Sequence, residues 1–97
     1  MRAVVATQWR RTKGVAVVDR GERVVAMNLE HLAQPPLVFA DTAAQIWRAL
    51  AKPRDERELI LELAAANGLE PKRIADDVRH FLAELSALGF VTAEGGS

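Results

Sequence analysis

Residues 37–50, with the sequence LVFADTAAQIWRAL, contain the change from a strand pattern to a helix pattern that decides the fold. Leu37-Val38-Phe39 is a short apolar run behind Pro35-Pro36, a pair that bars a helix from running through it, so we expect a strand here. Beyond it, Asp41-Thr42 offers a good N-cap, and apolar residues then recur at helical spacing. The stretch therefore predicts a strand that runs directly into a helix of about three turns, which Pro53 ends.

The segment before this strand has the pattern of a β-hairpin. Val15-Ala16-Val17-Val18 is apolar and rich in β-branched residues, and Asp19-Arg20-Gly21-Glu22 has a composition suited to a turn. Residues 23–29 are the predicted return strand, with Val and Met enriched between polar ends. Residues 30–34 then connect the hairpin to the third strand.

Two further helices are expected after Pro53. Asp55 precedes Glu58 at the distance of a capping box and opens the first of them, which Asn67-Gly68 closes. Pro71 is tolerated in the first turn of the second, and Gly89 ends it, so that Phe90-Val91 can fold back onto the core. One face of this last helix is apolar, at Ile74, Val78, Phe81, Leu82, Leu85 and Leu88.

The predicted order of three strands and then three helices places the chain in the α+β class. We expect one domain over residues 1–97, winged-helix-like, with a three-stranded antiparallel sheet followed by three helices. Its core covers about residues 14–91. Residues 1–13 are an N-terminal extension, and residues 92–97 are a tail in which residues 94–97 are expected to fray. Whether the extension adds a strand is left open.

The composition excludes several classes of function. Thirteen Lys and Arg balance thirteen Asp and Glu, so nothing indicates a polyanionic partner such as nucleic acid. The chain has no cysteine, which removes disulfides, thiolate nucleophiles and thiolate metal sites. Charged residues and Trp9 interrupt any apolar run near the N-terminus. We therefore expect no signal-peptide core, no membrane span and a cytoplasmic protein.

The remaining polar and aromatic residues form no catalytic pattern. His31 and His80 are far apart in the sequence and lack the spacing of metal ligands, so exposed neutral histidines are expected. Asp76 and Asp77 are adjacent and point about 100° apart on a helix, which is poor geometry for paired acid–base work. No nucleophile, oxyanion donor set or glycine-rich phosphate loop occurs. We therefore expect no enzyme activity, no cofactor and no metal, and we assign Trp47 to the core.

Two helical segments carry a family resemblance when they are taken together with the strands. Thr42-Ala-Ala-Gln-Ile-Trp opens the first helix, and Asp77-Val-Arg-His-Phe-Leu-Ala-Glu-Leu-Ser-Ala-Leu-Gly ends the third. With the hairpin before them, they resemble the pyrroloquinoline quinone biosynthesis protein D (PqqD) family over roughly residues 14–91. The chain departs from the family at Ala40, where members usually place an Asn.

A second alignment with that family would make residues 23–28 the third strand and residues 29–39 an insertion. We prefer residues 37–40 as the third strand, because they run straight into the helix cap.

The resemblance implies a function in peptide recognition. Members of the family bind the leader of a ribosomally made precursor peptide as an added strand. They present it to a maturation enzyme such as a radical SAM enzyme, a cyclase or a leader peptidase. An edge strand with unpaired backbone groups suits this mode independently. The resemblance places the peptide beside the third strand and against the third helix, at Leu37, Val38, Phe39, Ala40, Arg73, Ile74, Asp77, Val78, Phe81 and Glu84.

Two other functions stay open at this stage. DNA binding by a winged helix would need a basic face on the third helix, yet Lys72, Arg73 and Arg79 have acidic neighbours on the same helix. The other alternative is a structural subunit of a larger enzyme complex. For Arg73, Asp77 and Glu84, an ordinary solvent-exposed helix face is a simpler interpretation than a binding site. For Phe81, a role in the core is as well supported as a role in binding.

Overall fold

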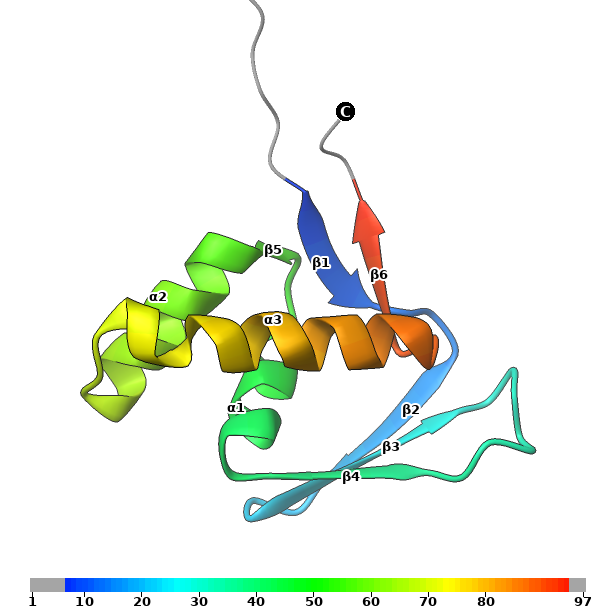
Figure 1. Cartoon of the computed structure of the whole chain (residues 1–97). Coiled ribbons are helices and arrows are strands. Elements are labelled where there is room, and N and C mark those ends of the chain that lie inside the picture. The colour runs from blue at the N-terminus through cyan, green and yellow to red at the C-terminus, as the bar shows by residue number, and fades with distance from the viewer. Residues whose placement is uncertain (1–6, 95–97) are drawn as a thin grey trace, which may run out of the picture.

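The structure of the protein is a computed structural model, which describes residues 7–94. These residues form strands in two sheets together with three helices (Figure 1). In chain order the elements are β1 (Gln8–Arg11), β2 (Val15–Asp19), β3 (Arg23–Asn28), β4 (Leu37–Ala40), α1 (Asp41–Ala49), β5 (Arg54–Asp55), α2 (Glu56–Asn67), α3 (Pro71–Ala87) and β6 (Val91–Glu94). The predicted α+β class is confirmed. The predictions for residues 1–6 and for the fraying of residues 95–97 lie outside the described residues.

The first sheet has the predicted strands in the order β2-β3-β4, and each pair is antiparallel. In its register Val18 faces Val25, and Val25 in turn faces Val38. Residues 37–40 are therefore the third strand of this sheet and lead straight into α1, as the preferred alignment requires. Residues 29–36 form the loop that precedes them.

The β2–β3 turn is tied to helix α1 by one arginine. Arg48 donates from Nε and from Nη2 to the two carboxylate oxygens of Asp19, each at 2.8 Å. The N–H of Gly21 also donates to Asp19, at 2.9 Å. These hydrogen bonds, the one from Arg48 first, lower the pKa of Asp19 to about 2.

The start of α1 differs from the prediction. Its N-cap is Ala40, which is extended with φ −135° and ψ 163°, and no side chain caps the helix. Asp41, expected with Thr42 to be the cap, is already in the helix and has φ +54°. The physical reason is that β4 continues through Ala40, so the chain turns at Asp41. Aspartate is one of the few residues besides glycine that enter the left-handed region at modest cost.

The two later helices begin and end as predicted. The Asp55 carboxylate accepts from the Glu58 N–H at 2.7 Å, and the Glu58 carboxylate accepts from the Asp55 N–H at 2.9 Å, which completes the capping box of α2. Gly68 ends α2 with φ +64°, a conformation that glycine adopts without a Cβ penalty. Pro71 stands in the first turn of α3.

The core lies between the first sheet and the helices. Trp47 is fully buried, as predicted, and its ring centroid lies 5.2 Å from that of Phe39. Phe90 is also fully buried, so the predicted return of the chain after α3 is confirmed. Asn28 is the buried polar residue at the end of β3, and its Nδ2 donates to the Gly89 carbonyl at 3.5 Å. This contact joins the sheet to the end of α3.

A second sheet, in the order β5-β1-β6, was not predicted from the sequence. Trp9 of β1 faces Arg54 of β5 on one side and Ala93 of β6 on the other. Residues 8–11, expected in an extension, and residues 92–94, expected in a tail, are thus parts of a sheet. These strands are largely polar and come from near the two ends of the chain, so neither local periodicity nor a turn signal reveals their pairing.

Arg11 connects this second sheet to the core. Its Nη2 donates to the Trp47 carbonyl at 2.7 Å, and the guanidinium carbon lies 4.7 Å from the centroid of the Trp47 ring. Burial lowers the pKa of Arg11 while Asp19 opposes that shift, and an arginine remains charged in either case. The guanidinium therefore combines a charge-assisted hydrogen bond with a cation–π contact.

Candidate functional site

Strand β4 lies at the edge of the first sheet (Figure 1). In an antiparallel sheet, successive residues direct their N–H and C=O groups alternately to the two sides. Two hydrogen bonds show which residues of the β3 strand face β2. The Leu29 N–H donates to the Gly14 carbonyl at 2.8 Å, just beyond one end of the pair. The Arg20 N–H donates to the Arg23 carbonyl at 2.8 Å at the other end. The odd-numbered residues of β3 therefore bond to β2, and the even-numbered ones bond to β4.

The register carries this alternation into β4. Phe39 faces the even-numbered Val24, so Phe39 bonds to β3 and, by the same alternation, so does Leu37. Val38 lies between them and directs both its N–H and its C=O to the free edge. Among the described residues no strand pairs with that side of β4. The backbone groups of Val38 are therefore available to an added strand.

The residues on either side of Val38 fit this arrangement. Pro36 is even-numbered like Val38, so its backbone also faces the free edge. Its missing N–H therefore leaves no acceptor of β3 unpaired. Ala40 also directs its N–H to the free edge, whereas its carbonyl lies at the N-cap of α1 and begins the helical hydrogen-bond pattern. The edge thus presents the carbonyl of Pro36, both groups of Val38 and the N–H of Ala40.

Helix α3 lies over the core side of β4. The rings of Phe81 and Phe39 meet edge to face, with centroids 5.4 Å apart and an interplanar angle of 78°. Figure 1 shows β4 running beneath α3 along the lower border of the molecule. Phe39 is buried whereas Phe81 is half-buried, so part of the Phe81 ring remains accessible beside the edge strand.

The predicted peptide-binding residues lie at three depths. Val38, Ala40, Arg73, Asp77 and Glu84 are exposed, Leu37 and Phe81 are half-buried, and Phe39, Ile74 and Val78 are buried in the core. The buried side chains support the surface from beneath, and direct contact with a peptide would require the core to open. The exposed and half-buried ones are accessible at the surface.

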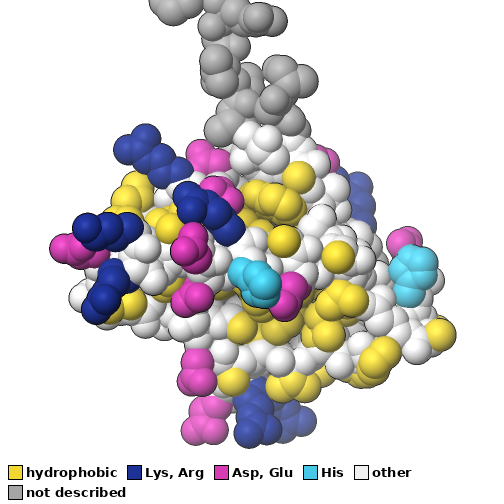
Figure 2. Space-filling model, in the orientation of Figure 1, with side chains coloured by type: hydrophobic (Ala, Val, Ile, Leu, Met, Phe, Trp, Pro, Cys, Tyr) yellow, Lys and Arg dark blue, Asp and Glu magenta, His cyan; other side chains and the backbone are white. Residues whose placement is uncertain are grey.

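Charges of both signs follow the exposed face of α3. The Nε2 atom of His80 lies 2.9 Å from the Glu84 carboxylate, and both histidines of the chain are exposed, as expected. Arg79 lies 3.0 Å from Glu56 of α2. On the face seen in Figure 2, acidic and basic side chains alternate along α3, while hydrophobic side chains gather below it toward β4 and the loop before that strand. This helix therefore presents no continuous basic face.

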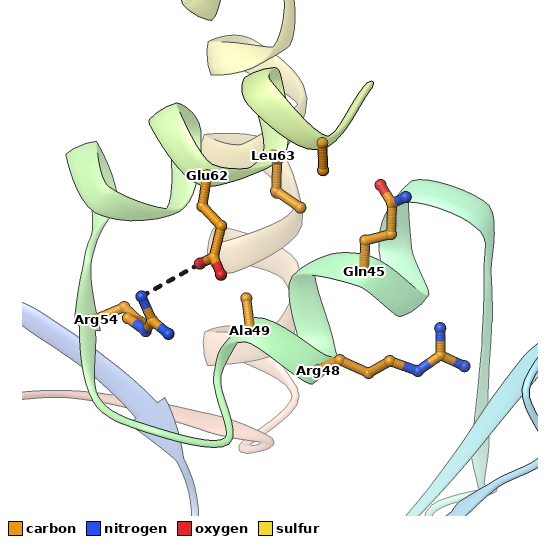
Figure 3. A pocket seen from close by; sticks show the side chains of 7 residues that line it. Gln45, Arg48, Ala49, Arg54, Glu62 and Leu63 are labelled. Carbon is orange, nitrogen blue, oxygen red and sulfur yellow. Dashed lines mark ion pairs between the residues drawn. The ribbon is translucent and has the colours of Figure 1, made fainter. Parts of the chain in front are cut away.

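A hollow of 320 Å³ lies between α1 and α2 (Figure 3). The Nη1 atom of Arg54 lies 3.3 Å from the Glu62 carboxylate within it, and Arg48 on its rim is held by Asp19. Its other lining residues are Gln45, Ala49, Leu63 and Ala66, which offer no nucleophile. Within residues 7–94, no group of three or more His, Cys, Asp or Glu side chains is arranged to hold a metal. In the same residues no helix has both the length and the apolar character needed to cross a membrane.

The family model of coenzyme PQQ synthesis protein D (PqqD) matches residues 23–91, from the start of β3 to the start of β6. The chain belongs to the PqqD family. The resemblance inferred from the sequence is thereby confirmed. No curated protein matches this PqqD-family chain. A solved structure described as "TbiB1 in Complex with the TbiA(beta) Leader Peptide" is similar to it, with a TM-score of 0.73. The similarity covers 91% of this chain and 98% of that one at 19% identity, and shows that the two share a fold.

Proposed function

We propose that this PqqD-family protein binds the leader segment of a ribosomally synthesised precursor peptide as a strand added to β4. The observation that carries the proposal is the free edge of β4, where Val38 directs both backbone groups away from the sheet. The similarity to TbiB1, which was solved in complex with a leader peptide, supports leader binding by a chain of this fold.

Backbone hydrogen bonds alone do not explain a specific complex. An added strand can exchange two hydrogen bonds with Val38 and reach one further group on each side, at Pro36 and Ala40. Each such bond contributes roughly 0.5–1.5 kcal/mol, so about four of them contribute roughly 2–6 kcal/mol. A micromolar complex requires about 8 kcal/mol. Side-chain contacts must therefore supply the remaining affinity and all of the selectivity.

The side of the added strand that faces α3 supplies part of these contacts. Every second side chain of the peptide points toward that helix. Phe81 and Leu37 are half-buried and apolar there, so they offer a surface for an apolar peptide side chain. Arg73, Asp77 and Glu84 are exposed on the same helix, so the rim there carries charges of both signs. We assign Phe81 the role of anchor and the three charged side chains the role of rim contacts.

We further propose that the protein acts as an adapter and not as a catalyst. The candidate site consists of a strand edge, apolar side chains and exposed carboxylates, without a nucleophile held next to a base. The chemical step then belongs to a separate maturation enzyme. A radical SAM enzyme, a cyclase and a leader peptidase are the candidates that the family resemblance suggests.

Proline substitutions at two adjacent positions test the docking edge. Val38→Pro removes an N–H that faces the free edge, so the protein should keep its thermal transition but bind the leader at least tenfold more weakly, about 1.4 kcal/mol. Phe39→Pro removes an N–H that bonds to β3 and should destabilise the sheet. Val38→Ala keeps the N–H and is the matched control. Calorimetric titration with the precursor peptide encoded beside the gene measures all three. A folded Val38→Pro variant with undiminished affinity would show that the peptide docks elsewhere.

A further inference from the structure

The face of the first sheet that points away from the helices is apolar in its middle. The register aligns Val18, Val25 and Val38 side by side across β2, β3 and β4. Their sequence neighbours Val24 and Phe39 are buried, so the aligned valines point to the opposite face. Val18 is 53% and Val38 59% exposed, which leaves this row open to solvent in the described part of the chain.

The side of this valine row that lies toward the β2–β3 turn is basic. Arg23 precedes Val25 by two residues on β3, and Arg20 is joined to Arg23 across the turn. A hollow of 430 Å³ opens here, lined by both arginines together with Glu22, Val25 and Val38. Within residues 7–94 neither arginine takes part in an ion pair. Figure 2 shows charged side chains gathered at the lower tip of the molecule, where the β2–β3 turn lies in Figure 1.

The hollow is continuous with the docking edge through Val38. The backbone of this residue points to the free edge, and its side chain lines the hollow. A strand added beside β4 places every second side chain on this outer face, one beside Val38 and one beside Ala40. Ala40 faces Arg23 in the register. Because Ala40 carries only a methyl group, the Arg23 guanidinium can extend across it to a side chain of the added strand.

We infer that the outer face of β4 is a second recognition site for the bound peptide, with a place for an apolar residue beside Val38 and for an acidic residue beside Ala40. This inference rests on the proposed strand addition. The apolar residue extends the valine row by one strand, and the carboxylate meets the unpaired guanidinium groups of Arg23 and Arg20. A peptide that uses both places carries an acidic residue two positions from an apolar one.

Nearby carboxylates limit the strength of the acidic preference. Glu22 lines the same hollow, and Asp41 lines a neighbouring hollow together with Arg23. The site is also exposed, so the charge contact is worth about as much as a surface ion pair, about fivefold in affinity. Salt should weaken the contact, because dissolved ions screen charges that are exposed to solvent, and they do so more strongly as the ionic strength rises.

Short random peptides displayed on their encoding RNA are the probe for this site. They are selected on the wild-type protein, and the tightest peptide that still binds Val38→Ala but fails to bind Val38→Pro is kept, so that its binding depends on the N–H at the β4 edge. Each acidic residue of this peptide is changed, one at a time, to the corresponding amide, Asp to Asn or Glu to Gln. The affinities of the acidic and amide peptides are then measured for wild type, for Arg23→Gln and for Arg57→Gln, which alters an exposed arginine on α2.

The expected result is coupling between one acidic peptide residue and Arg23. The amide peptide should bind wild type and Arg57→Gln about fivefold more weakly than the acidic one, and this difference should shrink clearly in Arg23→Gln, where Arg20 remains. A selected peptide without an acidic residue, or equal losses in all three proteins, would overturn the acidic site and leave strand addition standing. If no selected peptide depends on Val38, strand addition at β4 and the outer-face site both fail.

Discussion

The ring of Phe81 on α3 meets the ring of Phe39 on β4 edge to face, with centroids 5.4 Å apart. Phe39 also packs on Trp47, whose ring centroid lies 5.2 Å away. The three rings join the helix, the edge strand and the core in one contact chain. The spacing between α3 and the docking edge therefore depends on aromatic packing, which is stiff and directional.

Phe81→Ala should lower both stability and peptide affinity. Its ring is half-buried, so the loss in the free energy of unfolding should be about 2 kcal/mol, roughly half of the usual cost for a fully buried phenylalanine. Urea denaturation measures this loss. Phe81→Leu restores apolar contact but not the edge-to-face geometry, so it should recover most of the stability and less of the affinity. Equal recovery of both would argue against an anchoring role.

Trp47→Ala should cost roughly 3–5 kcal/mol of unfolding free energy, because the indole is fully buried. Trp47→Phe should cost clearly less. The indole Nε1 is buried without a hydrogen-bond partner among the described residues, so its removal breaks no hydrogen bond there. Chemical denaturation of both variants gives the comparison. A loss below about 1 kcal/mol for Trp47→Ala would be incompatible with a buried side chain.

Two adjacent arginines of β1 should differ in their effect on stability. Arg11→Met removes the charge-assisted hydrogen bond to the Trp47 carbonyl and should cost about 1.5–3 kcal/mol. Arg10→Met removes an exposed ion pair with Glu94 at 2.6 Å and should cost less than about 1 kcal/mol. Thermal and urea unfolding of the pair provide the test. Equal effects would mean that β1 is not held to the core through Arg11.

The Asp19–Arg48 contact should make the β2–β3 turn sensitive to acid. Hydrogen bonds from Arg48 and Gly21 hold the pKa of Asp19 at about 2, below its ordinary value of 3.8. A carboxylate with a lowered pKa stabilises the fold fully above its unfolded value and loses that contribution as the pH falls through the folded one. The turn should therefore loosen from about pH 4 down to about pH 2. An NMR titration of the carboxyl carbon measures the pKa, which Arg48→Gln should raise toward its ordinary value.

Duplex DNA should not bind saturably to the protein, even at low salt. The net formal charge is +0, and Lys72 and Arg79 of α3 lie at 3.7 Å and 3.0 Å from carboxylates of Glu70 and Glu56. Phosphate contacts need basic side chains that are free to release counterions. Fluorescence anisotropy with a labelled duplex is the measurement. Binding below micromolar concentration that falls steeply with salt would favour the winged-helix alternative over peptide capture.

Local sequence patterns were sufficient to predict the elements around the candidate site. The apolar run at residues 37–39, the capping box of Asp55 with Glu58 and the glycine after α2 act within a few residues of the chain. The strand and the helix ends that these patterns indicate can therefore be predicted without knowledge of tertiary contacts. The N-cap of α1 was predicted wrongly at Asp41-Thr42, because the strand before it extends one residue further than its apolar pattern.

Two features of the molecule were decided only in three dimensions. The second sheet joins β1 to β6, two mostly polar segments that lie far apart in the sequence. Arg11 donates to the carbonyl of Trp47, which is also distant in the sequence. No local pattern of residues predicts either contact. The sequence by itself determined that residues 37–40 form a strand of the sheet. Which of its backbone groups face outward depends on the register with β3, since a shift of one residue would exchange Val38 with Phe39 at the free edge.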